Sequence, residues 1–192
     1  MSLMNKIWLR VRRRAVDLSG DTRGIAAIEF AMIVPLMLVL FFGTVEFSSG
    51  VAVDRKVTLM ARTLSDLTSQ NISVTDAQLT NIFNASTGIM TPYSASPLKS
   101  TITELYVDPT TKVARVQWSK GDAPRGTGST VAIPTALQVG GSYLIYSEVS
   151  YKYVPAVGYI MAKAGIDLSD FTYTRPRQST CVMYNTTVCT TT

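Results

Sequence analysis

An apolar run near the start of the chain constrains its fold more than any other feature. The run has 23 residues, from Ile25 to Phe47, and its charged side chains are Glu29 near the start and Glu46 near the end. As an α-helix, at about 1.5 Å per residue, it would reach about 35 Å, whereas the hydrocarbon core of a bilayer is about 30 Å thick. The sequence therefore predicts one membrane-crossing helix.

The segment before this run is basic, and its charge predicts the orientation of the helix. It carries +4 of the net charge of +5, because its six cations outnumber its two carboxylates: Lys6, Arg10, Arg12, Arg13, Arg14 and Arg23 against Asp17 and Asp21. Short flanks rich in Lys and Arg stay in the cytoplasm. We therefore expect a cytoplasmic N-terminus and a C-terminal bulk on the other side of the membrane. Binding of nucleic acid or acidic lipid is the alternative use of such a flank, but the topology signal already explains the charge.

A secretory signal peptide also combines a basic start with an apolar run, and it is removed from the mature protein. The run here is longer than the roughly 7–15 apolar residues of a signal peptide. The nearest candidate for a cleavage site of small residues is Ser48-Ser49-Gly50. We therefore expect the helix to be retained.

The junction before the run resembles the processing site of type IV-like prepilins. In that family a basic leader ends in glycine, and a prepilin peptidase on the cytoplasmic side cuts after the glycine. A glutamate then stands at the fifth mature position, often followed by an aromatic residue. Arg23, Gly24 and Ile25 match the cut site, and Glu29 and Phe30 match the later positions. The resemblance implies cleavage between Gly24 and Ile25, where a residue without a Cβ lets a protease approach the backbone closely.

A wider set of residues narrows the resemblance to the TadE-like family, which comprises pseudopilins or minor pilins of tight-adherence pilus systems. The similarity covers about residues 22–50 and rests on Arg23, Gly24, Ala26, Ala27, Glu29, Phe30, Ala31, Pro35, Gly43 and Glu46. The leader departs from the family, because its 24 residues exceed the length of many prepilin leaders. Either Met1 or Met4 can therefore be the natural start.

Glu29 and Pro35 are the two unusual residues inside the run. A carboxylate within a membrane segment is costly and tends to be functional. Cleavage would create an α-amine at Ile25, and Glu29 of an adjacent subunit could pair with that amine in a dry helix bundle. Alternatively, Glu29 is close enough to the interface to reach the polar layer. Pro35 tends to kink a helix, which would suit a helix that leaves the bilayer or would be a static bend.

After Phe47 the apolar residues keep a helical spacing up to about Ser69. One face carries Val53, Val57, Met60, Ala61, Leu64 and Leu67. This periodicity predicts a single helix of about 45 residues, and a break at 48–50 is the alternative. An apolar stripe outside the membrane must be covered, and a sheet is the expected cover.

From residue 71 the pattern predicts a small α+β domain with an antiparallel sheet laid on the long helix. A turn at 71–75 precedes a helix at 75–84, which opens with the capping-box pair Thr75 and Gln78. Strands are expected at 101–107, 113–118, 143–154, 171–174 and 180–184, with a hairpin loop at 108–112 and short helices at 133–137 and 157–164. The expected domains are a leader (1–24), a transmembrane helix (25–47), a helix extension (48–70) and a periplasmic domain (71–192).

Two further features of this domain have open interpretations. Cys181 and Cys189 are the only cysteines, and in an exported domain they predict a disulfide; two free thiols on a mobile tail are the alternative. Five tyrosines crowd one stretch, and they indicate either sheet packing or an exposed interface: Tyr143, Tyr146, Tyr151, Tyr153 and Tyr159.

The chain has no histidine, which removes the commonest general base, the Ser-His-Asp triad and the usual zinc ligands. We expect no enzyme, no metal or cofactor, no small-molecule substrate and no nucleic-acid partner. The expected partners are membrane lipid, a prepilin peptidase, other pilin-like subunits and the pilus assembly platform. The resemblance implies a minor pilin or pseudopilin of the bacterial inner membrane that takes part in tight-adherence pilus assembly. The alternative is an uncleaved, membrane-anchored periplasmic scaffold or binding protein.

Overall fold

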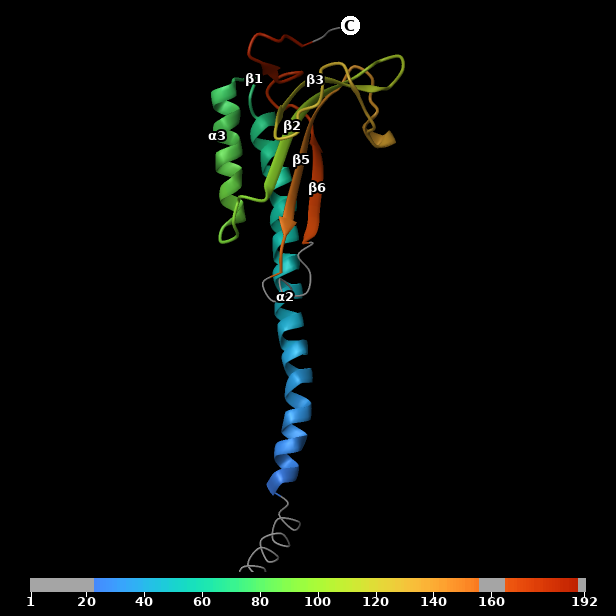
Figure 1. Ribbon diagram of the computed structural model, residues 1–192. Coiled ribbons are helices and arrows are strands. Elements are labelled where there is room, and N and C mark those ends of the chain that lie inside the picture. Colours follow the sequence, from blue (N-terminus) through green and yellow to red (C-terminus); the bar gives the residue numbers. More distant parts are fainter. Residues whose placement is uncertain (1–22, 156–164, 190–192) are drawn as a thin grey trace, which may run out of the picture. The chain divides into compact units, whose positions relative to one another are not determined.

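The computed structural model describes residues 23–155 and 165–189 of the chain, and Figure 1 shows their helices and strands. The chain divides into two compact units, Met1–Val45 and Glu46–Thr192. The helix predicted at 157–164 lies outside the described residues.

The long helix α2 spans Arg23–Ser69, 47 residues, and contains Pro35. The predicted single helix ending near Ser69 is thus confirmed. The alternative of a break at 48–50 is wrong, because helical hydrogen bonding continues through Ser48, Ser49 and Gly50. Pro35 is the one proline within these 47 residues, so one interior backbone donor is missing from the helix.

The predicted apolar face of α2 is buried over most of its length. Val53, Val57, Met60 and Leu64 are fully buried, and Ala61 is 1% exposed. The last predicted member of the face, Leu67, is only partly buried, and Thr68 takes the buried position instead. On an α-helix, the residue four positions after Leu64 lies closer to the Leu64 face than the residue three positions after it. The hydroxyl of Thr68 is satisfied because it donates to the Leu64 carbonyl at 2.8 Å.

The sheet that covers this face has five antiparallel strands in the order β4-β3-β2-β5-β6. Their bounds are β2 Leu98–Val107, β3 Ala114–Gly121, β4 Thr130–Val131, β5 Tyr143–Tyr153 and β6 Ile166–Thr174. The predicted α+β class with an antiparallel sheet is confirmed. β6 begins five residues earlier than predicted, because residues 166–170 pair with the last part of β5.

Local turn chemistry fixes the connections. Between β2 and β3, the side chain of Asp108 accepts hydrogen bonds from the backbone N–H groups of Thr110 and Thr111, as predicted for a hairpin loop. The helix α3, Asp76–Thr87, begins with a capping box in which Thr75 and Gln78 each accept from the backbone of the other. The 3-10 turns η1, Gly88–Met90, and η2, Thr135–Leu137, complete the connections.

A second, two-stranded sheet was not predicted. It pairs β1, Ser73–Val74, in parallel with β7, Met183–Tyr184. The prediction of a simple turn at 71–75 is therefore wrong. The short strand forms there because the C-terminal segment returns to the end of α2, where the Arg177 N–H donates to the Ser69 carbonyl at 2.9 Å.

Side-chain hydrogen bonds join α2 to the sheet that lies against its residues 46–69 (Figure 1). Ser147 Oγ donates to the Ala61 carbonyl at 2.6 Å, and Ser65 Oγ donates to the Ile145 carbonyl at 3.3 Å. The described tyrosines of β5 are each less than 9% exposed: Tyr143, Tyr146, Tyr151 and Tyr153. They are packing residues, so the interpretation as an exposed interface is wrong for these four. Tyr159 lies outside the described residues.

Candidate functional site

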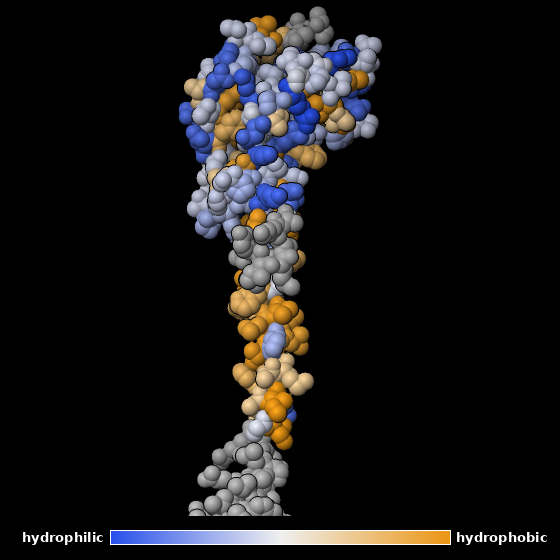
Figure 2. Space-filling view, in the orientation of Figure 1, coloured by the Kyte–Doolittle hydropathy of each residue, from blue (hydrophilic) through white to orange (hydrophobic). Residues whose placement is uncertain are grey.

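The first part of α2 presents apolar side chains in every direction. Fourteen large apolar residues between Ile25 and Phe47 are 40% to 75% exposed, and Figure 2 shows this stretch as a nearly continuous hydrophobic surface. Residues 36–42 are all exposed, and successive helical residues point about 100° apart, so the surface surrounds the helix. Among the described residues, α2 is the one helix long and apolar enough to cross a membrane. These properties indicate a membrane anchor.

The predicted processing junction lies in the first turn of α2. Gly24 is surrounded by open space, because a Cβ built on it would meet nothing within 4 Å. Ile25 is 55% exposed. A peptidase could therefore reach this peptide bond without disturbing a packed core.

The predicted assembly residues follow along the same helix. Glu29 and Phe30 are exposed, and Phe30 is 69% exposed. Glu29 stands four residues after Ile25, so the two share one face of α2. Within residues 23–155 and 165–189, no hydrogen bond or ion pair joins Glu29 to another side chain. The structure thus brings Ile25 and Glu29 onto one face and places Pro35 further along the helix.

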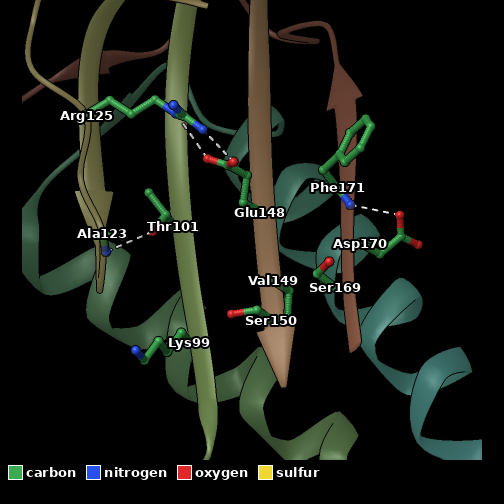
Figure 3. Close-up of a pocket in the computed structure, with 10 residues that line it drawn as sticks. All are labelled: Lys99, Thr101, Ala123, Arg125, Glu148, Val149, Ser150, Ser169, Asp170 and Phe171. Carbon is green, nitrogen blue, oxygen red and sulfur yellow. Dashed lines mark hydrogen bonds and ion pairs between the residues drawn. The ribbon is translucent and has the colours of Figure 1, made fainter. Parts of the chain in front are cut away.

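The outer face of the sheet holds a groove of about 380 Å³ between β2, β5 and β6 (Figure 3). Two of its four charged lining residues, Arg125 and Glu148, pair with each other. Glu148 accepts from Arg125 Nε at 3.1 Å, from Arg125 Nη2 at 2.5 Å and from the Tyr146 hydroxyl at 2.9 Å. The bonds to Glu148 raise the pKa of Arg125. Burial, with Glu148 adding to it, raises the pKa of Tyr146. This network fastens the 121–130 loop to the sheet.

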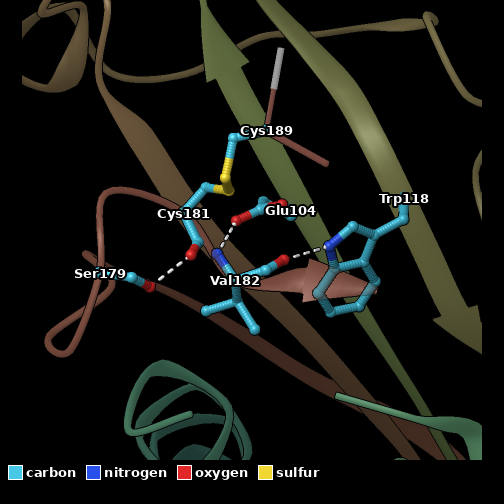
Figure 4. The surroundings of a disulfide bond; sticks show 6 residues. All are labelled: Glu104, Trp118, Ser179, Cys181, Val182 and Cys189. Atoms are coloured by element: carbon cyan, nitrogen blue, oxygen red, sulfur yellow. Dashed lines mark hydrogen bonds between the residues drawn. A yellow bond between two sulfur atoms is a disulfide. The ribbon is translucent and has the colours of Figure 1, made fainter. Parts of the chain in front are cut away.

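Glu104, in the second unit, is a buried residue that the sequence analysis does not single out (Figure 4). Glu104 is 2% exposed and accepts from the Val182 N–H at 2.6 Å. Trp118 Nε1 donates to the carbonyl of the same residue, Val182, at 2.8 Å. Burial raises the pKa of Glu104 to about 8, although the Val182 bond acts in the opposite direction. The sequence did contain a sign of this burial. Glu104 alternates with Ile102 and Tyr106 and so shares the inward face of a predicted strand.

The C-terminal segment is held at the same place by a disulfide between Cys181 and Cys189. Cys181 is 1% exposed and packs with Tyr106 and Tyr143. Both cysteines of the chain are in the bridge, so the alternative of two free thiols does not describe this structure. Glu104, Trp118 and the bridge together anchor the segment that forms β7. This cluster is structural in its geometry, since its polar atoms are paired with one another.

No group of three or more His, Cys, Asp or Glu side chains among the described residues is arranged to hold a metal ion. The candidate functional site is therefore the exposed apolar stretch of α2 together with the junction at its start. It combines the Gly24–Ile25 bond, whose cleavage stays a prediction, with a carboxylate four residues after Ile25 and a hydrophobic surface.

Comparison with known proteins points to the same segment. Neither the curated proteins nor the solved structures contain a match to the chain. A family model described as TadE-like protein matches residues 24–64. The match begins at the predicted processing glycine and continues through the apolar stretch into the buried stripe of α2. Over this segment the chain is similar to TadE-like proteins, and the family suggests a protein related to Tad pili.

Proposed function

We propose that this chain is a minor pilin or pseudopilin-like assembly factor of a tight-adherence pilus, and that a prepilin peptidase cuts it between Gly24 and Ile25. The leader lies in the cytoplasm, α2 crosses the bacterial inner membrane, and the α+β domain faces the periplasm. The observation that carries the proposal is the position of the TadE-like match, which begins at Gly24 and includes the whole exposed apolar stretch.

The exposed stretch suits a helix that changes its surroundings. Lipid tails and neighbouring apolar helices are similar solvents for Leu, Ile and Phe side chains, so exchange between them carries no large hydrophobic penalty. A subunit could thus be stored in the bilayer and later pack among the helices of an assembly. Backbone groups are satisfied within the helix in both surroundings.

Glu29 supplies the electrostatic part of the mechanism. Cleavage creates an α-amine at Ile25, four residues from Glu29 on the same helix face. While the subunit is stored, the carboxylate can neutralise the amine of its own chain. On assembly it exchanges this partner for the amine of a neighbouring subunit. Either pairing avoids a lone charge in a medium of low dielectric constant, which would cost several kcal/mol.

The cleavage step is tested by Gly24→Leu in cells that contain the peptidase, with Gly20→Leu as the matched control in the same leader. Wild type and Gly20→Leu should lose 24 residues and begin at Ile25, as read by N-terminal sequencing and intact mass. Gly24→Leu should keep its leader. An intact leader in the wild-type protein would reject processing and would favour the uncleaved membrane-anchored scaffold.

A further inference from the structure

A hydrophobic groove lies in the second unit, at the point where α2 enters it. It has a volume of about 360 Å³ and is lined by residues of α2 between 46 and 54 and by the strand ends beside them, including Phe47, Gly50, Val51, Pro155, Ile166 and Leu168. Phe47 is 75% exposed and Ile166 is 55% exposed. The α+β domain thus exposes apolar surface at one end of its sheet, which is costly in water.

The groove is continuous along the chain with the membrane-spanning stretch. Phe47 is the last residue of the apolar run and also the first apolar residue of the groove. Val51 stands one turn further along the same helix and is 38% exposed. The hydrophobic surface that faces lipid up to residue 47 therefore continues into the domain and does not stop at the end of the span.

Charge at the rim indicates which lipid fits. Among the described residues that line the groove, the charged ones are Glu46 and Asp54, both carboxylates. Glu46 is held in place because the Tyr153 hydroxyl donates to its Oε2 at 3.0 Å. The carboxylate of Asp54 would attract an ammonium headgroup and would repel a headgroup with net negative charge.

We propose that this groove holds an acyl chain of an ethanolamine phospholipid from the leaflet next to the domain, with its ammonium group beside Asp54. The acyl chain would cover Phe47, Val51 and Ile166. The α+β domain would then contact the bilayer through its own surface as well as through α2. This site depends on the membrane location of the chain but not on cleavage or on pilus assembly.

The test uses the full chain in vesicles of equal parts phosphatidylethanolamine and phosphatidylglycerol. A benzophenone amino acid replaces Ile166 in one protein and Val139 in the other. Val139 is also exposed, at 46%, and lies in the same unit. It precedes the start of β5, whereas the groove is at the end of that strand. After irradiation, mass spectrometry should find phosphatidylethanolamine joined at position 166 and no lipid at position 139.

A variant that fills the groove provides a second test of the proposal. A Cβ at Gly50 would meet a ring carbon of Tyr153 at 3.7 Å, an ordinary contact. Gly50→Ala should therefore be tolerated and leave the lipid adduct unchanged, while Gly50→Leu should fill the groove. If the new side chain keeps two methylene groups of the acyl chain out of the groove, the amount of lipid adduct should fall about tenfold.

Several results would overturn the proposal. Equal adducts with both lipids would reject the ammonium assignment. An adduct between two copies of the chain, or one within the chain to residues 156–164, would show that protein and not lipid occupies the groove. Failure of Gly50→Leu to reduce the adduct, in a variant that unfolds at the wild-type temperature, would place the lipid outside the groove.

Discussion

The two parts of α2 share one backbone conformation and differ in what surrounds their side chains. Between Ile25 and Phe47 fourteen large apolar residues are 40% to 75% exposed, whereas Val53, Val57, Met60 and Leu64 are fully buried. The first part is apolar on every face, and the second confines its apolar residues to a stripe. Helix formation and burial are therefore separate outcomes. Both parts form the same backbone hydrogen bonds, but the distribution of apolar side chains around the helix decides whether lipid or a sheet covers it.

The largest contrast is expected from placing a carboxylate in each part. Leu64→Asp buries an unpaired charge against the sheet, at a cost of several kcal/mol, which is comparable with the whole stability of a typical domain, about 5–15 kcal/mol. The α+β domain should therefore fail to unfold cooperatively in near-ultraviolet circular dichroism in detergent.

Leu38→Asp is the matched control for this prediction, because Leu38 is 48% exposed in the apolar stretch. It should leave the melting of the domain unchanged and reduce the recovery of the protein in the membrane fraction. A loss of domain folding in Leu38→Asp would mean that the two parts of α2 are not independent.

Glu29→Ala tests the carboxylate of the exposed part. If the helix served only as an anchor, removing the charge would leave insertion unchanged or improve it. We expect normal insertion and normal cleavage after Gly24, but loss of co-purification with pilus components, because the neighbouring α-amine loses its partner. Membrane fractionation and a pull-down measure the two effects. Normal piliation in this variant would return Glu29 to the role of an interfacial carboxylate.

Removal of the disulfide should affect the second unit alone. Replacing Cys181 and Cys189 by serine opens a short loop, and the entropic effect of such a loop is about 2–3 kcal/mol at most. The melting temperature of the domain should fall, with no change in membrane fractionation. A reduced but unsubstituted protein is the control, and it should melt at the temperature of the double variant.

Glu104→Gln sharpens the contrast between an exposed and a buried glutamate. The pKa of Glu104 in the folded protein, about 8, is above the usual 4.5. Its protonated form therefore stabilises the fold most below pH 4.5, and this contribution is lost as the pH rises to about 8, at up to about 1.4 kcal/mol per pH unit. The difference in unfolding free energy between variant and wild type should follow this curve. A difference independent of pH would reject the raised pKa.

The elements that the sequence predicts well are those with local signals. The end of α2 near Ser69, the Thr75–Gln78 capping box and the hairpin at Asp108 each depend on residues a few positions apart. The same holds for the candidate site, because the positions from Arg23 to Pro35 form one contiguous motif. Whether the bond after Gly24 is cut, and whether Glu29 pairs with an amine, stay predictions.

The features that were missed depend on contacts between distant residues. The pairing of Val74 with Tyr184 has no local pattern, since each strand has two residues. Glu104 is buried because Val182 and Trp118 close over it, and neither is near it in the sequence. Residues at the start of β6, such as Asp167 and Ser169, are too polar to suggest a strand, and pairing with β5 determines their conformation.

The hydrogen bonds between α2 and β5 also determine how the domain would respond to mechanical tension. Glu46 bonds to Tyr153, Ala61 to Ser147 and Ser65 to Ile145, so the helix and the strand run in opposite directions. From Glu46 to Ser65 the helix advances about 28 Å, and from Tyr153 to Ile145 the strand advances about 27 Å. The two lengths agree, so the three hydrogen bonds are spaced alike along the helix and along the strand. A pull along the axis of α2 would load them together in shear, a geometry in which they must break at once and cannot unzip in turn.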